Sequence, residues 1–368
     1  MTAPRLDVDL DVIAQNTRVL VDRLVPRGIR VTGVSKASLG STAVAAAMLR
    51  GGATAIGDSR VENLERLRAA DPGTPLTLIR SPMLSQVDRV VRGSDQSLNT
   101  EAVVLAALSA AALCERVVHD VVLMVELGDL REGVAVDEVV DLAATVAGLS
   151  GLRLTGLGTN LACRSGIVPD QDKMDQLSEL VDLVEARVGH PLTVVTGGNS
   201  ANLDWAFGTD DVGRVNELRL GESILLGTEP LHRHVVEGLR TDAFTLAAEV
   251  IEVQTKPRRS WGTTGQDAFG RTPHRGRPGL VRQAILALGR QDVDPDGATP
   301  PAGMSVLAAS SDHLVLDVGD HGVVVGDEIG FQLDYSALVR AMTSPFVRTG
   351  TSGPAEPLPA PVPTRGAA

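Results

Sequence analysis

From the N-terminus to about position 229, the chain alternates short apolar runs with segments of helical periodicity. Each run ends in a polar or glycine-rich turn, and the segment after it carries an apolar stripe at three- and four-residue spacing. Eight such runs follow one another: "RVTGVSK" (30–36), "ATAIGDS" (53–59), "LTLIR" (76–80), "DQSLN" (95–99), "DVVLMVE" (120–126), "RLTGLGTN" (153–160), "LTVVTGG" (192–198) and "ELRLG" (217–221). Eight strands alternating with helices predict a (β/α)8 TIM barrel, a fold of the α/β class. A doubly wound open sheet is the alternative, and the absence of a GxGxxG opening argues against it.

The pattern changes at about residue 230. Stretches such as "FTLAAEVIEVQTK" (244–256) and "MSVLAASSDHLVLDVG" (304–319) predict antiparallel strands joined by turns, with almost no helix. We therefore expect a barrel over residues 1–229, whose first few residues could pair with the second domain, and a C-terminal antiparallel β domain over 230–347. Residues 348–368 are rich in Pro and Ala and have no apolar period, which predicts a disordered tail.

Composition narrows the choice of function. Apolar residues make up 43% of the chain and aromatic residues only 2%, so Val, Leu, Ile and Ala must build the core, as suits parallel strands buried on both faces. The net charge of −12, with no basic block, excludes a nucleic-acid-binding surface and attraction to an anionic membrane. No apolar leader or membrane-length window occurs, and the two cysteines show no metal-binding spacing. We expect a cytoplasmic protein with no membrane, nucleic-acid or metal partner.

Polar residues at the predicted strand ends carry the candidate chemistry, because barrels of this type place their sites at the C-terminal ends of the strands. Lys36 and Arg219 lie on strands that are otherwise apolar, and a role in helix capping would not explain a basic residue at these positions. A lone lysine there is more often a surface residue, but several cations on one rim favour a site for an anionic group. The turns "VVTGGNSANL" (194–203) and "LRLGESILLG" (218–227) offer backbone N–H groups and hydroxyls. Either turn alone could be a simple connector, and together they favour a phosphorylated ligand.

The segments "GVSKA", "GDSRVENL", "GTNLAC", "GGNSANL" and "LRLGESILLG", followed by a β domain, resemble the fold-type III pyridoxal-phosphate enzymes. The resemblance runs from about residue 5 to about residue 347 and is closest to the alanine-racemase-like group, within it the ornithine racemases. It implies an isomerase that uses pyridoxal 5'-phosphate to interconvert the L- and D-forms of an amino acid, ornithine or a related basic one. It also implies a head-to-tail homodimer, in which the β domain of one chain closes over the barrel mouth of the other and the active sites are shared.

The resemblance assigns roles to individual residues. Lys36 falls where the family's lysine forms a covalent imine with the cofactor, and the released lysine can remove and return the α-proton. Arg219 falls where the family pairs an arginine with the pyridine nitrogen. A guanidinium keeps its proton, so that nitrogen stays unprotonated, which suits racemisation over transamination. The resemblance also implies that Asn160 contacts the cofactor, at the position where alanine racemases stack a histidine on it. Tyr335 falls where the family places a hydroxyl near the phosphate, although by itself it could be an aromatic residue in the core of a β-strand. The residues implied to hold the phosphate are Asn199, Ser200, Gly221 and Glu222.

The chain departs from the alanine racemases at the second catalytic acid. In alanine racemases a tyrosine acts as the second acid, whereas in this chain the matching segment reads "LGRQDV" and has Arg290 at that position. The acid on the face opposite Lys36 must therefore be another group. The candidates are Asp292, Asp312 and His313, and the sequence does not choose among them.

Substrate contacts are implied for Arg131, which matches the arginine that steers the substrate carboxylate, and are expected for Asp267 and Arg290. A distal amine would need an acidic partner, which Asp267, Asp292 or Asp312 could supply, although each could equally be a turn residue. Met124 stands where alanine racemases often carry a modified lysine. Cys163 could line the substrate pocket, or it could be a buried cysteine with no role in catalysis.

Three alternatives to a racemase stay open. A fold-type III aldolase would need a metal-binding histidine with a second ligand near the C-terminus, and a decarboxylase would need a cysteine in the β domain. No cysteine follows Cys163, and His313 has no obvious companion ligand. A non-catalytic cofactor carrier of this barrel type would lack the β domain.

Overall fold

The computed structural model describes residues 2–71, 73–270, 272 and 278–353. It divides the chain into two compact units. The barrel unit covers Leu10–Arg240, and the β unit combines the N-terminal residues up to Asp9 with Thr241–Gly353. The boundary expected between residues 229 and 230 therefore lies later, after Arg240, because Asn16 holds the backbone of Arg240 to the barrel unit by two hydrogen bonds of 2.8 Å.

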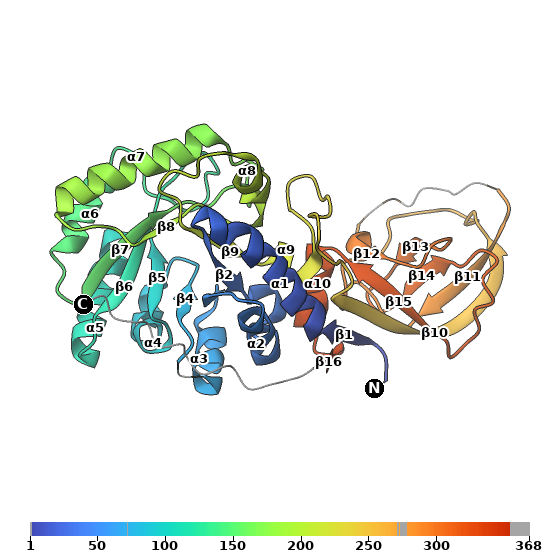
Figure 1. Cartoon of the computed structure of the whole chain (residues 1–368). Helices are drawn as coiled ribbons and strands as arrows, with labels where there is room; N and C mark the ends of the chain where they lie inside the picture. The colour runs from blue at the N-terminus through green and yellow to red at the C-terminus, as the bar shows by residue number, and fades with distance from the viewer. Residues whose placement is uncertain (1, 72, 271, 273–277, 354–368) are drawn as a thin grey trace. The chain divides into compact units, whose positions relative to one another are not determined.

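The barrel unit contains a closed parallel barrel of eight strands, which confirms the predicted fold (Figure 1). The strands follow chain order around the barrel, and β9 closes it by pairing with β2. Their bounds are β2 Arg30–Val34, β3 Ala55–Asp58, β4 Leu76–Leu78, β5 Gln96–Asn99, β6 His119–Met124, β7 Leu152–Gly158, β8 Val194–Thr196 and β9 Glu217–Leu220. Each lies within the apolar run that predicted it or extends just beyond that run.

Helices connect the strands and begin where the sequence supplies caps. Ser41 accepts from the Val44 N–H at the start of α2, Asp170 accepts from the Lys173 N–H at the start of α7, and Gly189, in the left-handed region, ends α7. The helices are α1 Leu10–Leu24, α2 Thr42–Arg50, α3 Val61–Ala70, α4 Val87–Gly93, α5 Ala102–Glu115, α6 Val139–Ala147, α7 Gln171–Val188, α8 Leu203–Gly208 and α9 Glu222–Leu226. In the described part of the chain, none of the helices combines the length and apolarity needed to cross a membrane.

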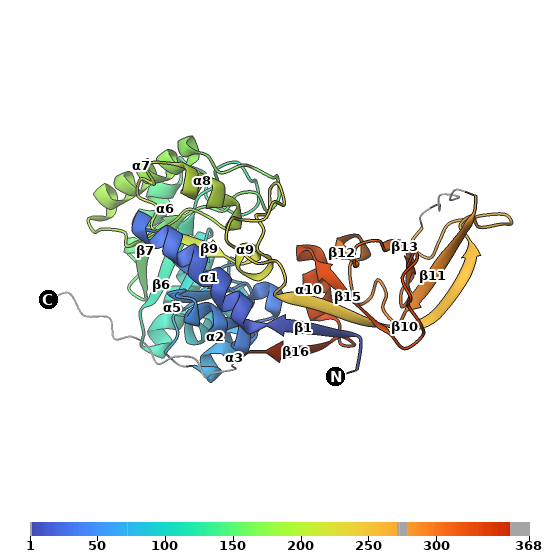
Figure 2. The ribbon, with the colours of Figure 1, turned by 45° about the vertical axis from the view of Figure 1, so that its right-hand side comes forward.

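The β unit is an antiparallel sheet, as predicted for the C-terminal region (Figure 2). Its strand order is β12-β15-β10-β11-β14-β13. Strand β1 joins it by pairing antiparallel to β10, and β16 pairs parallel to β1. The bounds are β1 Arg5–Asp9, β10 Phe244–Pro257, β11 Leu280–Leu286, β12 Ala298–Thr299, β13 Ser305–Ala309, β14 Leu314–Asp317, β15 Glu328–Leu333 and β16 Arg348–Ser352.

Two segments of the β unit differ from the prediction. Tyr335–Thr343 form helix α10, not strand, because Asp334 caps it by accepting from the Ala337 N–H at 2.8 Å, and Ala337, Leu338 and Ala341 bury one face. The tail expected to be disordered from residue 348 instead begins with strand β16, whose residues lie in register with β1. Residues 354–368 of that expected tail lie outside the described residues.

Candidate active site

Lys36 stands just beyond β2, in the 3₁₀ turn η2 (Lys36–Ser38), and is half-buried. The preceding Ser35 donates its hydroxyl hydrogen to Asp58 Oδ2, at the end of β3, over 2.8 Å. Asp58 is fully buried and also accepts from the Arg60 N–H (2.9 Å) and from Asn63 Nδ2 (3.0 Å). Burial raises the pKa of Asp58, and these donors oppose that shift. Asp58 therefore fixes the turn that presents Lys36.

Arg219 lies within β9 and is 4% exposed. Its guanidinium donates to the Thr159 carbonyl (2.9 Å), to Asn160 Oδ1 (3.4 Å) and to the Thr196 hydroxyl. All three acceptors are neutral, and burial lowers the pKa of Arg219. A buried cation with only neutral acceptors favours a further polar partner. Its register partner on β2 is Thr32, on the strand that leads to Lys36, so the two cations belong to neighbouring strands.

Three buried side-chain atoms on or next to the barrel strands lack a hydrogen-bond partner among the described residues: Thr32 Oγ1, Asn99 Oδ1 and Asn160 Nδ2. Two of them adjoin Arg219, since Thr32 is its register partner and Asn160 accepts one of its hydrogen bonds. Buried polar atoms in proteins are normally satisfied by protein, water or a ligand. The barrel thus offers donors and acceptors around Arg219 that a polar ligand would complete.

The turns after β8 and β9 meet through two serine hydroxyls. Ser200 Oγ lies 3.0 Å from Ser223 Oγ and accepts from the Ser223 N–H at 3.2 Å. A Cβ at Gly221, which precedes α9, would approach Val34 of β2 to 3.2 Å, which is tighter than ordinary contact. Two hydroxyls beside short helix starts suit a phosphate group. Ser223 was not predicted, and its only sequence signal is its place shortly after Gly221.

Asn199 and Glu222, both expected near the phosphate, use their side chains to hold the turns together. Asn199 Nδ2 donates to the Leu161 carbonyl (2.9 Å) and to Asn160 Oδ1 (3.1 Å), so it links the turns after β7 and β8. The Glu222 carboxylate pairs with Arg233 in the following loop. The two side chains therefore position the turns.

Arg131 and Cys163 lie close enough to Arg219 to influence its pKa. Burial opposes the charge of Arg131, but the hydrogen bond to Glu132 and the electrostatic interaction with Cys163 raise its pKa above the ordinary value. Cys163 acts in the same direction on Arg219, and its Sγ lies 3.5 Å from Asn199 Nδ2. Cys163 is exposed, so the buried-spectator interpretation is wrong.

Met124 is 1% exposed and packs with Leu98, Val122 and Val194 in the barrel core. An apolar side chain among apolar neighbours fills this position in place of the modified lysine of alanine racemases.

In the β unit, Arg290 and the pair Asp312–His313 lie side by side. The Arg290 N–H donates to the Ser310 carbonyl (2.9 Å), and His313 Nδ1 lies 2.9 Å from Asp312 Oδ1 in an exposed turn. The hydrogen bond from His313 lowers the pKa of Asp312. The guanidinium of Arg290 also lies 5.2 Å from the ring centre of Phe269. The structure thus pairs the backbone of Arg290 with the turn that carries the Asp312–His313 pair.

Three other candidates of the β unit have structural contacts of their own. Asp292 is 4% exposed and accepts from the Ser344 hydroxyl (2.8 Å) and the Gly289 N–H (3.2 Å). Asp267 accepts from the Phe269 N–H at 2.8 Å, as a turn residue does. Tyr335 is the first residue of α10, so its interpretation as a β-strand aromatic is wrong.

Comparisons with known proteins agree with this architecture. The family described as "Alanine racemase, N-terminal domain" matches residues 8–230. The lysine racemase of Thermotoga maritima is 37% identical over 350 residues, 94% of this chain and 98% of that protein. The ornithine racemase of Acetoanaerobium sticklandii is 32% identical over 94% of this chain and 98% of its own length. The crystal structure of alanine racemase from the D-cycloserine producer Streptomyces lavendulae has a TM-score of 0.79 at 19% identity, covering 96% of this chain and 98% of that one. The chain therefore belongs to the alanine racemase family of fold-type III pyridoxal-phosphate enzymes.

Proposed function

We propose that the protein is a pyridoxal-phosphate-dependent racemase of basic amino acids, acting on lysine, ornithine or both. The observation that carries the proposal is the pairing of β2 with β9, which places a strand-end lysine and a buried arginine on neighbouring strands of the barrel. The names of the lysine and ornithine racemases that resemble this chain supply the substrate class.

The residues of the barrel fit the cofactor. The unsatisfied Asn160 Nδ2 and the neutral surroundings of Arg219 suit a polar aromatic ring, and the hydroxyls of Ser200 and Ser223 suit its phosphate. When bound, pyridoxal phosphate withdraws electrons from the substrate α-carbon and so acidifies its hydrogen. Lys36 would hold the cofactor covalently.

The side chains of the protein then have separate roles in catalysis. The Lys36 amine removes the α-proton on one face and can return it there. Arg219 would face the ring nitrogen and keep its own proton, which would limit electron withdrawal and disfavour transamination. Arg131 orients the substrate carboxylate by a charge-assisted hydrogen bond. On the opposite face we assign proton transfer to His313, which Asp312 holds at 2.9 Å, because Asp292 is buried and already hydrogen-bonded.

We further propose that the active unit is a head-to-tail homodimer, in which His313 acts on substrate held by Lys36 of the partner subunit. The β unit supplies an exposed acid–base pair, Asp312–His313, and the basic Arg290 beside it. An exposed pair in a turn is accessible to another chain.

Deuterium exchange tests the function directly. The enzyme is incubated in heavy water with L-lysine, L-ornithine, L-arginine or L-alanine, and deuterium at the α-carbon is followed by NMR together with the appearance of the D-enantiomer. Lysine or ornithine should exchange fastest, and exchange with none of the basic amino acids would refute the proposal.

Borohydride labelling tests the cofactor site. The chain contains three lysines, Lys36, Lys173 and Lys256, so reduction followed by peptide mapping has three possible outcomes. The label should fall on Lys36. The matched control is Lys173→Ala, which should retain cofactor and activity, whereas Lys36→Ala should lose both; a label on either other lysine would contradict the assignment.

A further inference from the structure

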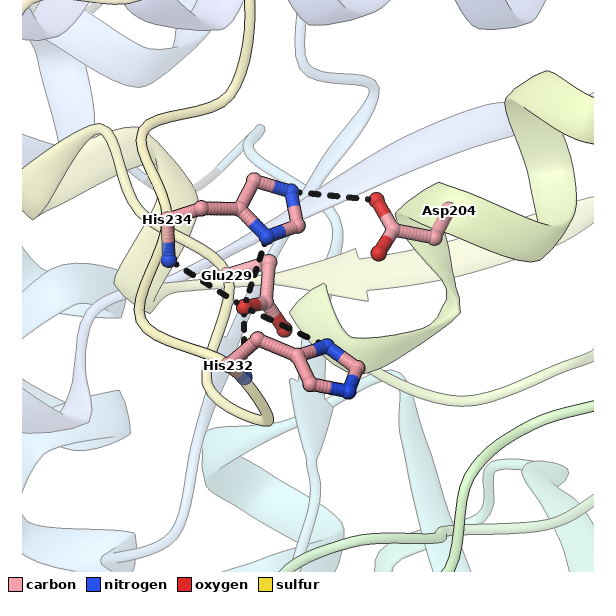
Figure 3. Close-up of side chains that lie close together, drawn as sticks. All are labelled: Asp204, Glu229, His232 and His234. Carbon is pink, nitrogen blue, oxygen red and sulfur yellow. Dashed lines mark hydrogen bonds and ion pairs between the residues drawn. The ribbon is translucent and has the colours of Figure 1, made fainter.

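Four metal-ligating side chains of the barrel unit, none of them assigned to the cofactor, converge at one point (Figure 3). Asp204 comes from α8, and Glu229, His232 and His234 come from the loop that follows α9, in the sequence "EPLHRH". One ligand atom from each residue can be chosen so that all four atoms lie within 4.8 Å of one another. Cysteine spacing gave no hint of this cluster, because its ligands are histidines and carboxylates.

The loop itself is a tight hairpin that aims these side chains. Thr228 and Val235 form an antiparallel bridge, and the Glu229 N–H donates to the His234 carbonyl at 3.1 Å. Arg233 adopts the left-handed conformation (φ 61°) at the turn, so His232 and His234 lie with their rings stacked, 6.2 Å apart and inclined by 17°. The hairpin therefore presents two imidazoles on one side.

Glu229 is a preorganised ligand. Its carboxylate is 1% exposed, and it accepts from the Leu231 N–H (2.7 Å) and the His232 N–H (2.6 Å). These backbone donors thus hold in place the carboxylate oxygen that faces the imidazoles.

The contacts of His234 with two carboxylates favour a cation within the cluster. Its Nδ1 lies 3.2 Å from Glu229 Oε1, and its Nε2 lies 3.3 Å from Asp204 Oδ1. A neutral imidazole carries one N–H, so only one of these two contacts can be a hydrogen bond while the other sets a lone pair against a carboxylate oxygen. His232 Nδ1 adds a second imidazole 3.8 Å from Glu229 Oε1. Either a proton or a metal ion on the cluster removes the conflict.

The ligand chemistry favours a metal ion of the zinc type. Imidazole nitrogen and carboxylate oxygen bind Zn²⁺ at about 2.0–2.2 Å, and a tetrahedral arrangement places neighbouring ligand atoms roughly 3.3 Å apart. The two separations from Glu229 Oε1, 3.2 Å to His234 Nδ1 and 3.8 Å to His232 Nδ1, are close to that spacing, and one oxygen of Asp204 lies within 4.8 Å of a ligand atom from each of the other three residues. His232, His234 and Asp204 are 62%, 47% and 53% exposed, so an ion can reach the site, and their rings and carboxylate can turn toward it.

We propose that Asp204, Glu229, His232 and His234 form a binding site for one divalent transition-metal ion, with Zn²⁺ as the preferred ion. The bound ion fastens the hairpin to α8. Because Arg233, between the two histidines, pairs with Glu222 at the first residue of α9, the ion also steadies the start of that helix.

Zinc titration of the full-length, untagged protein tests this site. The protein is treated with a chelator, desalted, and titrated with ZnCl₂ in competition with a chromophoric chelator, with no free pyridoxal phosphate present. One equivalent of Zn²⁺ should bind per chain, and Co²⁺ in its place should give visible absorption bands. Asp204→Asn should weaken binding about 10-fold or more, as a missing ligand does, and Mg²⁺ should not compete, because it prefers all-oxygen sites.

Matched variants distinguish this site from adventitious binding. His232→Ala/His234→Ala should lose the equivalent, whereas His190→Ala/His321→Ala, which removes two histidines elsewhere, should keep it. Circular dichroism in the absence of metal checks that each variant is folded, and Asp204→Asn covers the case in which the double variant is not. If the unaltered chain binds no Zn²⁺, or if the Asp204→Asn chain binds it equally tightly, the cluster is a proton-bridged ion pair and the proposal is wrong.

Discussion

His119, at the N-terminal end of β6, should make the stability of the barrel strongly dependent on pH. It is 2% exposed, and its Nε2 lies 2.9 Å from the hydroxyl of Ser97, which also accepts from Asn99 Nδ2 at 3.0 Å. The Ser97 hydroxyl hydrogen is available for Nε2, an arrangement that suits a neutral ring. Burial lowers the pKa of His119 to about 4, although the charges of Asp120 and Asp95 oppose the shift. The N-terminal ends of barrel strands serve stability, so the cofactor site stays untouched.

The size of the effect follows from linkage. Because the folded-state pKa lies below the ordinary 6.5, the unfolded chain binds more protons between the two values, and the free energy of unfolding rises with pH in that window. The stabilisation that comes from keeping His119 neutral is complete above pH 6.5 and is lost as the pH falls to about 4. The whole shift corresponds to about 3 kcal/mol, and going from pH 7.5 to pH 5 removes roughly 2 kcal/mol of it.

Urea unfolding of His119→Gln at pH 7.5 and pH 5 measures this contribution. Trp205 is 8% exposed in α8 and Trp261 is 83% exposed in the β unit, so a Trp261→Phe background makes the fluorescence report the barrel. The parent should lose roughly 2 kcal/mol more than His119→Gln between the two pH values at equal protein concentration. His190→Gln is the control for the substitution itself. An equal loss in the parent and in His119→Gln would refute the reasoning.

Three further predictions concern the active site. Arg219→Glu should let the cofactor nitrogen hold a proton, so the ratio of keto acid formed to substrate racemised should rise; an unchanged ratio in cofactor-loaded enzyme would remove the electronic role. Ser223→Ala, which deletes one of the two phosphate-side hydroxyls, should raise the dissociation constant of pyridoxal phosphate about 5- to 30-fold, the equivalent of one hydrogen bond of about 1–2 kcal/mol, and Ser109→Ala is its control. Mixing Lys36→Ala with His313→Asn chains should restore up to half of the activity per mixed dimer, and failure after proven subunit exchange would place the second acid on the same chain as the lysine.

The barrel could be predicted from the sequence because its local and global signals agree. All eight strands are apolar runs that end in polar turns, and most of their residues are buried whichever face they occupy, so the hydrophobic pattern is strong in every one. The strand-end rule then singled out Lys36 and the turns at Ser200 and Gly221 without any knowledge of contacts.

What escaped prediction depends on pairings between distant residues. Strand β16 becomes a strand only because β1, near the N-terminus, offers an edge to it, and nothing within "RTGTS" signals that partner. Helix α10 was hidden because its apolar residues continue those of β15 without a break, and only the Asp334 cap marks the change. The metal cluster needs Asp204 beside a hairpin that comes later in the chain, a juxtaposition that no spacing rule describes.

The carboxylates of the barrel rim support the proposal that the β unit of a partner subunit contacts a basic substrate. A distal ammonium group needs an accessible anion when it leaves water. The acids at the strand ends are each occupied within the barrel unit: Asp58 by Ser35 and Asn63, Glu126 by the Gly128 and Leu130 N–H groups, Asp129 by the Arg164 and Ser165 N–H groups, Glu132 by Arg131 and Glu222 by Arg233. In the β unit, Asp312 holds His313, whereas Asp267 stands in an exposed turn where its carboxylate is accessible to the side chain of lysine or ornithine. We therefore propose that the barrel holds the α-amino acid and that the β unit of a partner subunit supplies the anion for its distal amine.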